Sequence, residues 1–227
     1  AGDALAALPG EERQTIAGRL LGAGQFALRL GRIDRAFAFI DADQRLAEPD
    51  SPLLDQIDAT AHGACTEHAR YDEGDRRFDA IVRRDRMPKA AFAPVAAAQV
   101  TTLVFRGRFA QAFELAFAAL RELGLDTPAP DEWPAAVRRE RALLRAALER
   151  LGERPIETLP RIDDPVLEGA SMVLKAFPPR IDDNVLQRDW CVLRGVRIGF
   201  EHGASSSFGE LLVASVGVMS VVGDYAI

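Results

Sequence analysis

The sequence is poor in the features that mark secreted, membrane-spanning and nucleic-acid-binding proteins. Only Cys65 and Cys191 are cysteines, too few for the disulfide framework of a small secreted domain. The first residues lack the basic segment of a signal peptide, and the longest apolar run, 211–222, is shorter than the roughly 20 residues that span a membrane. The net charge of −6 argues against a basic face for nucleic acid. We therefore expect a cytoplasmic protein that binds neither membrane nor nucleic acid.

Aromatic residues are also few, at 7% of the chain, and no segment shows the apolar–polar alternation of β-strands. Apolar residues, at 48%, are nevertheless sufficient for a substantial core. In 131–152 and in 184–203 they recur at steps of three, four or seven residues, which places them on one face of a helix. Proline-rich breaks separate such segments. The sequence therefore predicts an all-α fold.

A short motif that recurs along the chain indicates helical hairpins. It begins with glycine at the joint between two helices, and a large apolar residue and a small residue follow two and five positions later. Glycine supplies the positive φ of a tight joint, and the small residue lets the helices approach closely. A weaker copy begins at Gly74 but lacks the small residue, so the spacing is irregular. The repeat-defining residues are Gly24, Gly31, Ile33, Ala36, Gly107, Phe109, Ala112, Gly223 and Tyr225.

These offsets match tetratricopeptide hairpins, so we expect an irregular, tetratricopeptide-like solenoid of stacked helix pairs. Residues 1–127 would hold the hairpins, and 128–227 would continue the helical repeat within one superhelical domain. The stretch 223–227 resembles a turn that enters another helix. We therefore also expect the chain to be a fragment of a larger protein.

Candidate metal ligands are present in the sequence but do not form a complete set. His62, Cys65 and His68 lie three residues apart, which spreads them over about a third of a helix circumference. A zinc site needs four ligands, or three with an open position. Because no fourth ligand is in sight, we expect a buried cysteine with two partly exposed histidines.

Two acidic pairs, Asp163-Asp164 and Asp182-Asp183, have the composition of a magnesium site. Each pair precedes a predicted helix, where a carboxylate caps the first turn and complements the helix dipole. His202 and the serines after it lie where one helix ends and another begins. Phosphate-binding glycine motifs are absent from the sequence. We expect no catalytic residue, no metal and no cofactor.

Several side chains are candidates for an interaction surface. The arginines of 138–154 alternate with glutamates at helical spacing, which is typical of a solvated face. Docking of an acidic partner is the alternative, because arginine is enriched at interfaces. An aromatic platform at Trp190 or Trp133 would suit a small effector. The candidate interaction residues are Arg138, Arg141, Arg145, Trp190 and His202.

The order of these segments is similar to that of a known family. The matching segments are 12–24 ahead of Gly31, Arg106-Gly107-Arg108-Phe109, Ala119-Leu120, Leu123-Gly124-Leu125, Pro128, Leu159-Pro160, Asp163-Asp164-Pro165, His202-Gly203-Ala204-Ser205 and Gly223-Asp224-Tyr225. They resemble the helical-repeat region of large bacterial signalling proteins that join a P-loop ATPase module to serine/threonine-kinase-like and histidine-kinase modules. The resemblance implies a non-catalytic connector of a parent kinase or ATPase. Its partners would be proteins or peptides, including flanking domains of the same chain.

The resemblance is incomplete at Gly74, and no catalytic role carries over to His202. Two alternatives stay open. Large ATP-dependent transcription activators also carry a helical-repeat superhelix, which senses a small effector. A freestanding all-α enzyme would instead need acid, base or metal groups that converge on one cavity.

Overall fold

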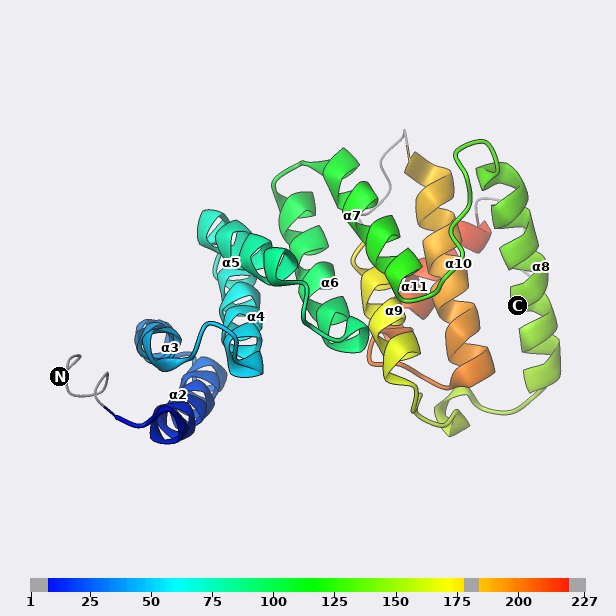
Figure 1. Cartoon of the computed structure of the whole chain (residues 1–227). Coiled ribbons are helices and arrows are strands. Elements are labelled where there is room, and N and C mark those ends of the chain that lie inside the picture. Colours follow the sequence, from blue (N-terminus) through cyan, green and yellow to red (C-terminus); the bar gives the residue numbers. More distant parts are fainter. Residues whose placement is uncertain (1–7, 178–183, 221–227) are drawn as a thin grey trace. The chain divides into compact units, whose positions relative to one another are not determined.

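Every helix or strand element in the part of the chain that the structure describes is a helix. A computed structural model describes residues 8–177 and 184–220, which contain ten α-helices and one short 3-10 helix (Figure 1). The prediction of an all-α fold is confirmed. Within those residues no helix is both long and apolar enough to cross a membrane. The repeat positions Gly223 and Tyr225, and the pair Asp182-Asp183, lie outside the described residues.

The chain divides into two compact units, Ala1–Pro88 and Lys89–Ile227. In the first unit the helices pack as two sequential pairs, α2 with α3 and α4 with α5, and α4 also contacts both helices of the first pair. The helix bounds in this unit are Gly10–Arg29 for α2, Ile33–Leu46 for α3, Pro52–Glu67 for α4 and Tyr71–Arg84 for α5.

The joint between α2 and α3 has the geometry of a Schellman motif. Gly31 has φ +66°, its N–H donates to Leu28 O, and the N–H of Arg32 donates to Ala27 O at 2.9 Å. These bonds satisfy carbonyls that the end of a helix leaves free. Gly107, with φ +69°, closes its helix with the same two bonds.

A third joint of this kind lies five residues before the position that the sequence suggests. Ala69, not Gly74, has the positive φ, of 55°, and the N–H of Arg70 donates to Cys65 O at 2.9 Å. Gly74 lies inside α5, where a Cβ would come 3.3 Å from the Cβ of Cys65. It is therefore the small residue of this copy, at the place where the helices approach most closely.

With this register the hairpins recur regularly. The joint residues Gly31, Ala69 and Gly107 have numbers that differ by 38 each time. The expectation of irregular spacing is thus wrong over these three hairpins. The weaker copy was counted from Gly74, which is its small residue, and not from the joint residue Ala69. The large residues two positions on are Ile33, Tyr71 and Phe109, and the small residues five positions on are Ala36, Gly74 and Ala112.

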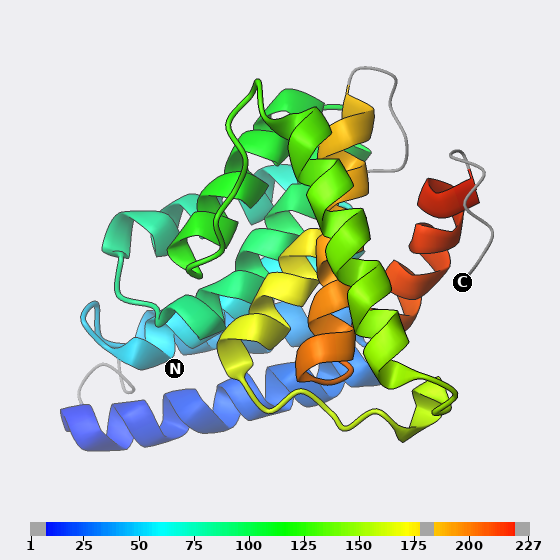
Figure 2. The same cartoon turned by 90° about the vertical axis from the view of Figure 1, so that its right-hand side faces the viewer.

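In the second unit only some of the pairs are sequential. The bounds are Lys89–Phe105 for α6, Phe109–Glu122 for α7, Trp133–Leu151 for α8, Ile156–Thr158 for the 3-10 helix η1, Pro165–Lys175 for α9, Val185–His202 for α10 and Phe208–Ser220 for α11. Helix α6 packs on both α7 and α9, and α8 packs on α10 rather than on α9. Figure 2 shows α8 in yellow-green beside α10 in orange. Helices α6 and α7 share a core with α8–α11, and the division between the two compact units accordingly falls between residues 88 and 89.

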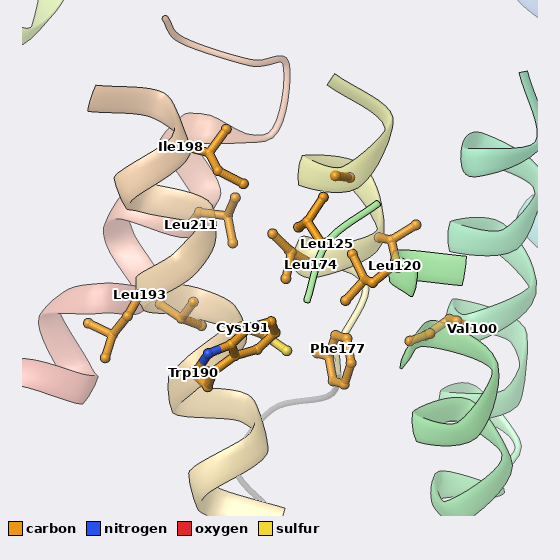
Figure 3. Close-up of a cluster of buried hydrophobic side chains, with 14 of the residues drawn as sticks. Val100, Leu120, Leu125, Leu174, Phe177, Trp190, Cys191, Leu193, Ile198 and Leu211 are labelled. Atoms are coloured by element: carbon orange, nitrogen blue, oxygen red, sulfur yellow. The ribbon is translucent and has the colours of Figure 1, made fainter. Parts of the chain in front are cut away.

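The core of the second unit is built from large side chains of all its α-helices. Figure 3 shows Trp190 and Leu193 of α10 with Leu174 of α9 and Leu120 of α7. Trp190 is 1% exposed and Trp133 is 7% exposed, and their rings lie 5.9 Å apart. Both tryptophans belong to the core of the unit, so neither offers the aromatic platform that would favour an effector-sensing superhelix.

Candidate functional site

A groove in the second unit lies where α8 and α10 end. Its volume is about 460 Å³, within the range of roughly 300–1,000 Å³ that small-molecule sites occupy. The linker between α8 and α9, which includes η1, forms one wall. The lining residues are Ala147, Arg150, Leu151, Arg154, Leu159, Pro160, Phe200, Glu201 and His202.

Two glycines and a short backbone pairing hold this wall in place. Gly152 and Gly203 follow the last residues of α8 and α10 with φ of +62° and +110°. Ala204 donates its N–H to Pro160 O at 2.8 Å and accepts from the N–H of Ile162 at 3.2 Å. A Cβ on Gly203 would approach Pro160 O to 2.8 Å. The absence of a side chain at Gly203 therefore lets the linker lie against the end of α10.

The groove is lined by both apolar and charged side chains. Arg150 Nη2 lies 3.1 Å from Glu201 Oε1. Arg154 donates from Nε to Leu151 O at 3.2 Å and from Nη2 to Arg150 O, also at 3.2 Å. His202, another lining residue, is exposed. The arrangement is suited to bind a small molecule with an apolar body and polar ends.

A buried ion pair joins α8 to α10 next to this groove. The Glu140 side chain is only 3% exposed, and its Oε2 accepts from Arg197 Nε at 2.8 Å. Arg194 Nη1 lies 3.2 Å from Glu140 Oε1, and Glu201 accepts from Arg197 Nη1 at 2.5 Å. Burial lowers the pKa of Arg197, but the hydrogen bond and charge of Glu140 and the charge of Glu201 raise it above its ordinary value overall.

The charged stripe of α8 is therefore only partly a solvated face. Arg138 and Arg145 are exposed, whereas Arg141 is half-buried with its Nη2 3.9 Å from Asp189 Oδ2. Glu140 points into the unit. Of the expected interaction residues, Arg138, Arg145 and His202 are at the surface.

The first unit contains its own buried polar cluster. Asp58, with a side chain 1% exposed, accepts from Arg77 Nη1 at 3.0 Å and from Arg84 Nη2 at 2.6 Å. Arg77 also donates to Gln44 Oε1 at 2.6 Å, and Arg84 Nε donates to Asp55 Oδ1 at 2.6 Å. Burial lowers the pKa of both arginines, but Asp58 and Glu73 raise the pKa of Arg77 above its ordinary value overall, and Asp58 and Asp55 do the same for Arg84. These paired charges fasten α5 to α4 and α3.

Two of the three candidate metal ligands take core positions of the second hairpin. His62 and Cys65 precede the joint residue by seven and four positions, as Gly24 and Ala27 do in the first hairpin. Both are fully buried, so the expectation of a partly exposed His62 is wrong, whereas the buried Cys65 is confirmed. Burial raises the pKa of the Cys65 thiol to about 11. No group of His, Cys, Asp and Glu side chains within 8–177 and 184–220 is arranged to hold a metal ion.

The predicted cap at Asp164 is confirmed. Its Oδ1 accepts from the N–H of Val166 at 2.8 Å and of Leu167 at 3.4 Å, at the first turn of α9. A carboxylate there compensates unpaired N–H groups and the helix dipole. The residue therefore has a structural role that accounts for its position.

One buried carboxyl was not singled out by the sequence. Asp43 of α3 is 0% exposed, and neither of its carboxylate oxygens has a hydrogen-bond partner in the structure. Burial raises its pKa from 3.8 to about 7. The 38-residue repeat could have revealed that this position is buried. The positions 38 and 76 residues further on hold Ile81 and Ala119, which are apolar and buried. Asp43 thus carries a carboxyl at an apolar core position.

Comparison with known proteins identifies no family. No family model matches the chain, and no curated protein and no solved structure matches it either. What is established is that residues 8–177 and 184–220 form an all-α structure in which ten packed α-helices lie largely in sequential pairs.

Proposed function

We propose that the chain is a non-catalytic helical-repeat scaffold, the regulatory connector of a larger cytosolic signal-transduction ATPase or kinase. The observation that supports this most strongly is the recurrence of one joint geometry at a constant step of 38 residues. Repeated hairpins of one register are the unit of solenoids, whose extended surfaces bind proteins and peptides. The tetratricopeptide-like solenoid is part of the proposal, as are its protein partners.

Buried ion pairs that join one helix to another also favour a scaffold. Asp58 and Glu140, the most deeply buried acceptors of the two polar clusters, each hold arginines from a second helix. Such pairs are costly to break, because removal of one partner leaves a buried charge without compensation. They fix helix against helix, which is what a connector needs to transmit a displacement between its ends.

The experiment that tests the proposal is to determine the reading frame on both sides of this sequence. A P-loop ATPase on one side and a kinase or sensor module on the other would support the connector. The joined protein would then be purified, and its ATPase rate compared with that of an Arg197→Met variant that loosens α8 from α10. An ATPase rate that does not respond to the loosened connector, or a frame that encodes only this chain, would overturn the proposal.

A second candidate function, an effector-sensing superhelix, is favoured by the groove between α8 and α10. Its volume and its mixed lining suit a small amphipathic ligand. The buried tryptophans do not contribute to it. The test is to purify the protein under native conditions, release bound small molecules by denaturation and identify them by mass spectrometry. An Arg154→Ala variant should lose the same molecule if the groove holds it.

A further inference from the structure

One face of α2 is exposed from the first turn of the helix to the last. At about 100° per residue, six exposed residues lie within about 40° of the direction in which Gly22 faces. The buried residues of α2 lie on other sides of the helix, which packs on α3 and α4 (Figure 1). The six residues, which form the outer face of α2, are Glu11, Thr15, Gly18, Gly22, Phe26 and Arg29.

In the second hairpin, the equivalent face packs on the first hairpin. The 38-residue step leads from positions 22 and 26 to Thr60 and Ala64 of α4. Thr60 Oγ1 accepts from Gln25 Nε2 of α2 at 3.4 Å, and Ala64, 3% exposed, belongs to an apolar cluster with side chains of α3. The outer face of α2 therefore has the position of a stacking surface, yet the described chain leaves Phe26 on it 55% exposed.

The two glycines of the outer face are not explained by packing within the first unit. A Cβ at Gly18 or at Gly22 would meet no atom within 4 Å. Glycine inside a helix is less stable than alanine, because it loses more backbone freedom on folding. At Gly24, by contrast, a Cβ would lie 3.2 Å from Ile40 Cγ1 of the neighbouring helix. Two exposed glycines one turn apart thus favour the close approach of a helix from outside the unit.

We propose that the outer face of α2 binds the same face of a second copy of the chain, with the two helices antiparallel about a two-fold axis at Gly22. Such an interface is self-complementary, because each contact occurs twice. From helix geometry, Phe26 of each copy faces the space bounded by positions 15, 18, 19 and 22 of the other. Because Gly18 and Gly22 have no side chains, that space can hold the ring.

Charge complementarity favours a second copy as the occupant. Glu11 lies in the first turn of α2 and Arg29 in the last. In the antiparallel arrangement Arg29 of each copy lies beside Glu11 of the other, so two ion pairs join the copies. Neither side chain has an ion pair within the described residues. Arg29 Cζ lies 5.7 Å from the centre of the Phe26 ring, so the charge and the ring belong to one continuous surface.

Oxidative cross-linking of Gly22→Cys tests the position of the two-fold axis. The two native cysteines are buried, so a linked dimer joins the introduced thiols. We expect the disulfide-linked dimer to form at least tenfold faster than in an Ala142→Cys control, at an exposed position of α8, because the axis brings the two thiols together. Equal rates would overturn the inference. So would loss of the cross-link when the upstream part of the native reading frame is joined to the chain, because that part would then cover the face.

Charge reversal, followed by sedimentation velocity, tests whether the ion pairs join two copies. The mass of the wild type should rise toward that of a dimer at about 100 μM, because two facing helices form a small interface. Glu11→Arg and Arg29→Glu should each stay monomeric, since each places like charges together. An equimolar mixture of the two variants should dimerise again, because every contact then joins an arginine to a glutamate.

Circular dichroism of each variant checks that its helices are intact. A wild type that stays monomeric at that concentration, or a mixture that does not dimerise, contradicts the proposed interface. The connector proposal does not depend on this result, because it is decided by the neighbouring reading frame.

Discussion

Replacement of Asp43 by alanine should remove a pH-dependent loss of stability in the first unit. The carboxyl is fully buried, without a hydrogen-bond partner, and its pKa is raised from 3.8 to about 7 by burial. Alanine is chosen because Ala119 has the corresponding place in the third hairpin and is buried there. The smaller side chain introduces no overlap with its neighbours.

The sign and size of the effect follow from proton linkage. Between pH 4 and pH 7 the unfolded chain has released the Asp43 proton while the folded chain retains it, so stability falls as the pH rises. Each pKa unit corresponds to about 1.4 kcal/mol, so a shift from 3.8 to about 7 corresponds to a loss of up to about 4 kcal/mol by pH 8. The contribution is fully present below pH 4 and absent above pH 7.

Urea unfolding from pH 4.5 to pH 8.5, followed by circular dichroism at 222 nm, measures this loss in the wild type and in Asp43→Ala. Other carboxylates titrate in both proteins, so the difference between the two isolates Asp43. Tryptophan fluorescence provides an internal control, because Trp133 and Trp190 lie in the second unit. Asp34→Asn, at an exposed position of the same helix, should leave the pH profile unchanged. A wild-type-minus-variant difference that is independent of pH would refute the reasoning.

Three further substitutions give separate tests. Ala69→Gly should raise the free energy of unfolding by about 0.5–1 kcal/mol, because a non-glycine residue with positive φ is strained; a lower midpoint in urea would count against the assigned joint. Gly199→Ala should cost about 1–3 kcal/mol, since its Cβ would overlap the ring of Phe208, and thermal unfolding monitored by fluorescence measures it. Arg197→Met should cost about 1.5–3 kcal/mol, because the buried Glu140 loses the hydrogen bond from Arg197 Nε and keeps only Arg194 as a charged partner. The double variant with Glu140→Gln should recover much of that loss in urea titrations.

Two of the three hairpin joints, at Gly31 and Gly107, could be predicted from the sequence, and the misplaced third shows where such prediction fails. Glycine is the usual residue at positive φ, so Gly31 and Gly107 were assigned to joints, and Gly74 was assigned to one by analogy. The joint at Ala69 uses alanine instead, and Gly74 serves close packing. Glycine thus has two roles in these hairpins, positive φ at a joint and close packing between helices. The identity of a single residue does not show which role it has.

The polar clusters could not be predicted, for a different physical reason. Glu140 lies in a run of arginines, and the helical period alone allows it to face solvent or core. Its burial depends on α10, which supplies Arg194 and Arg197 from more than 50 residues further along the chain. The cap at Asp164, by contrast, depends only on the residues that follow it, and local sequence was enough to predict it.

The pairing of α8 with α10 has a consequence for the order of folding. Glu140 and Arg197 are separated by 57 residues, whereas Asp58 and Arg77 in the first unit are separated by 19. Closing the longer loop costs about 1 kcal/mol more in chain entropy, since the cost grows as 1.5 RT ln n. Local contacts also form sooner than distant ones. In a stopped-flow refolding experiment the first unit should therefore gain its helices ahead of the second, and recovery of tryptophan fluorescence should lag behind the first rise in helicity.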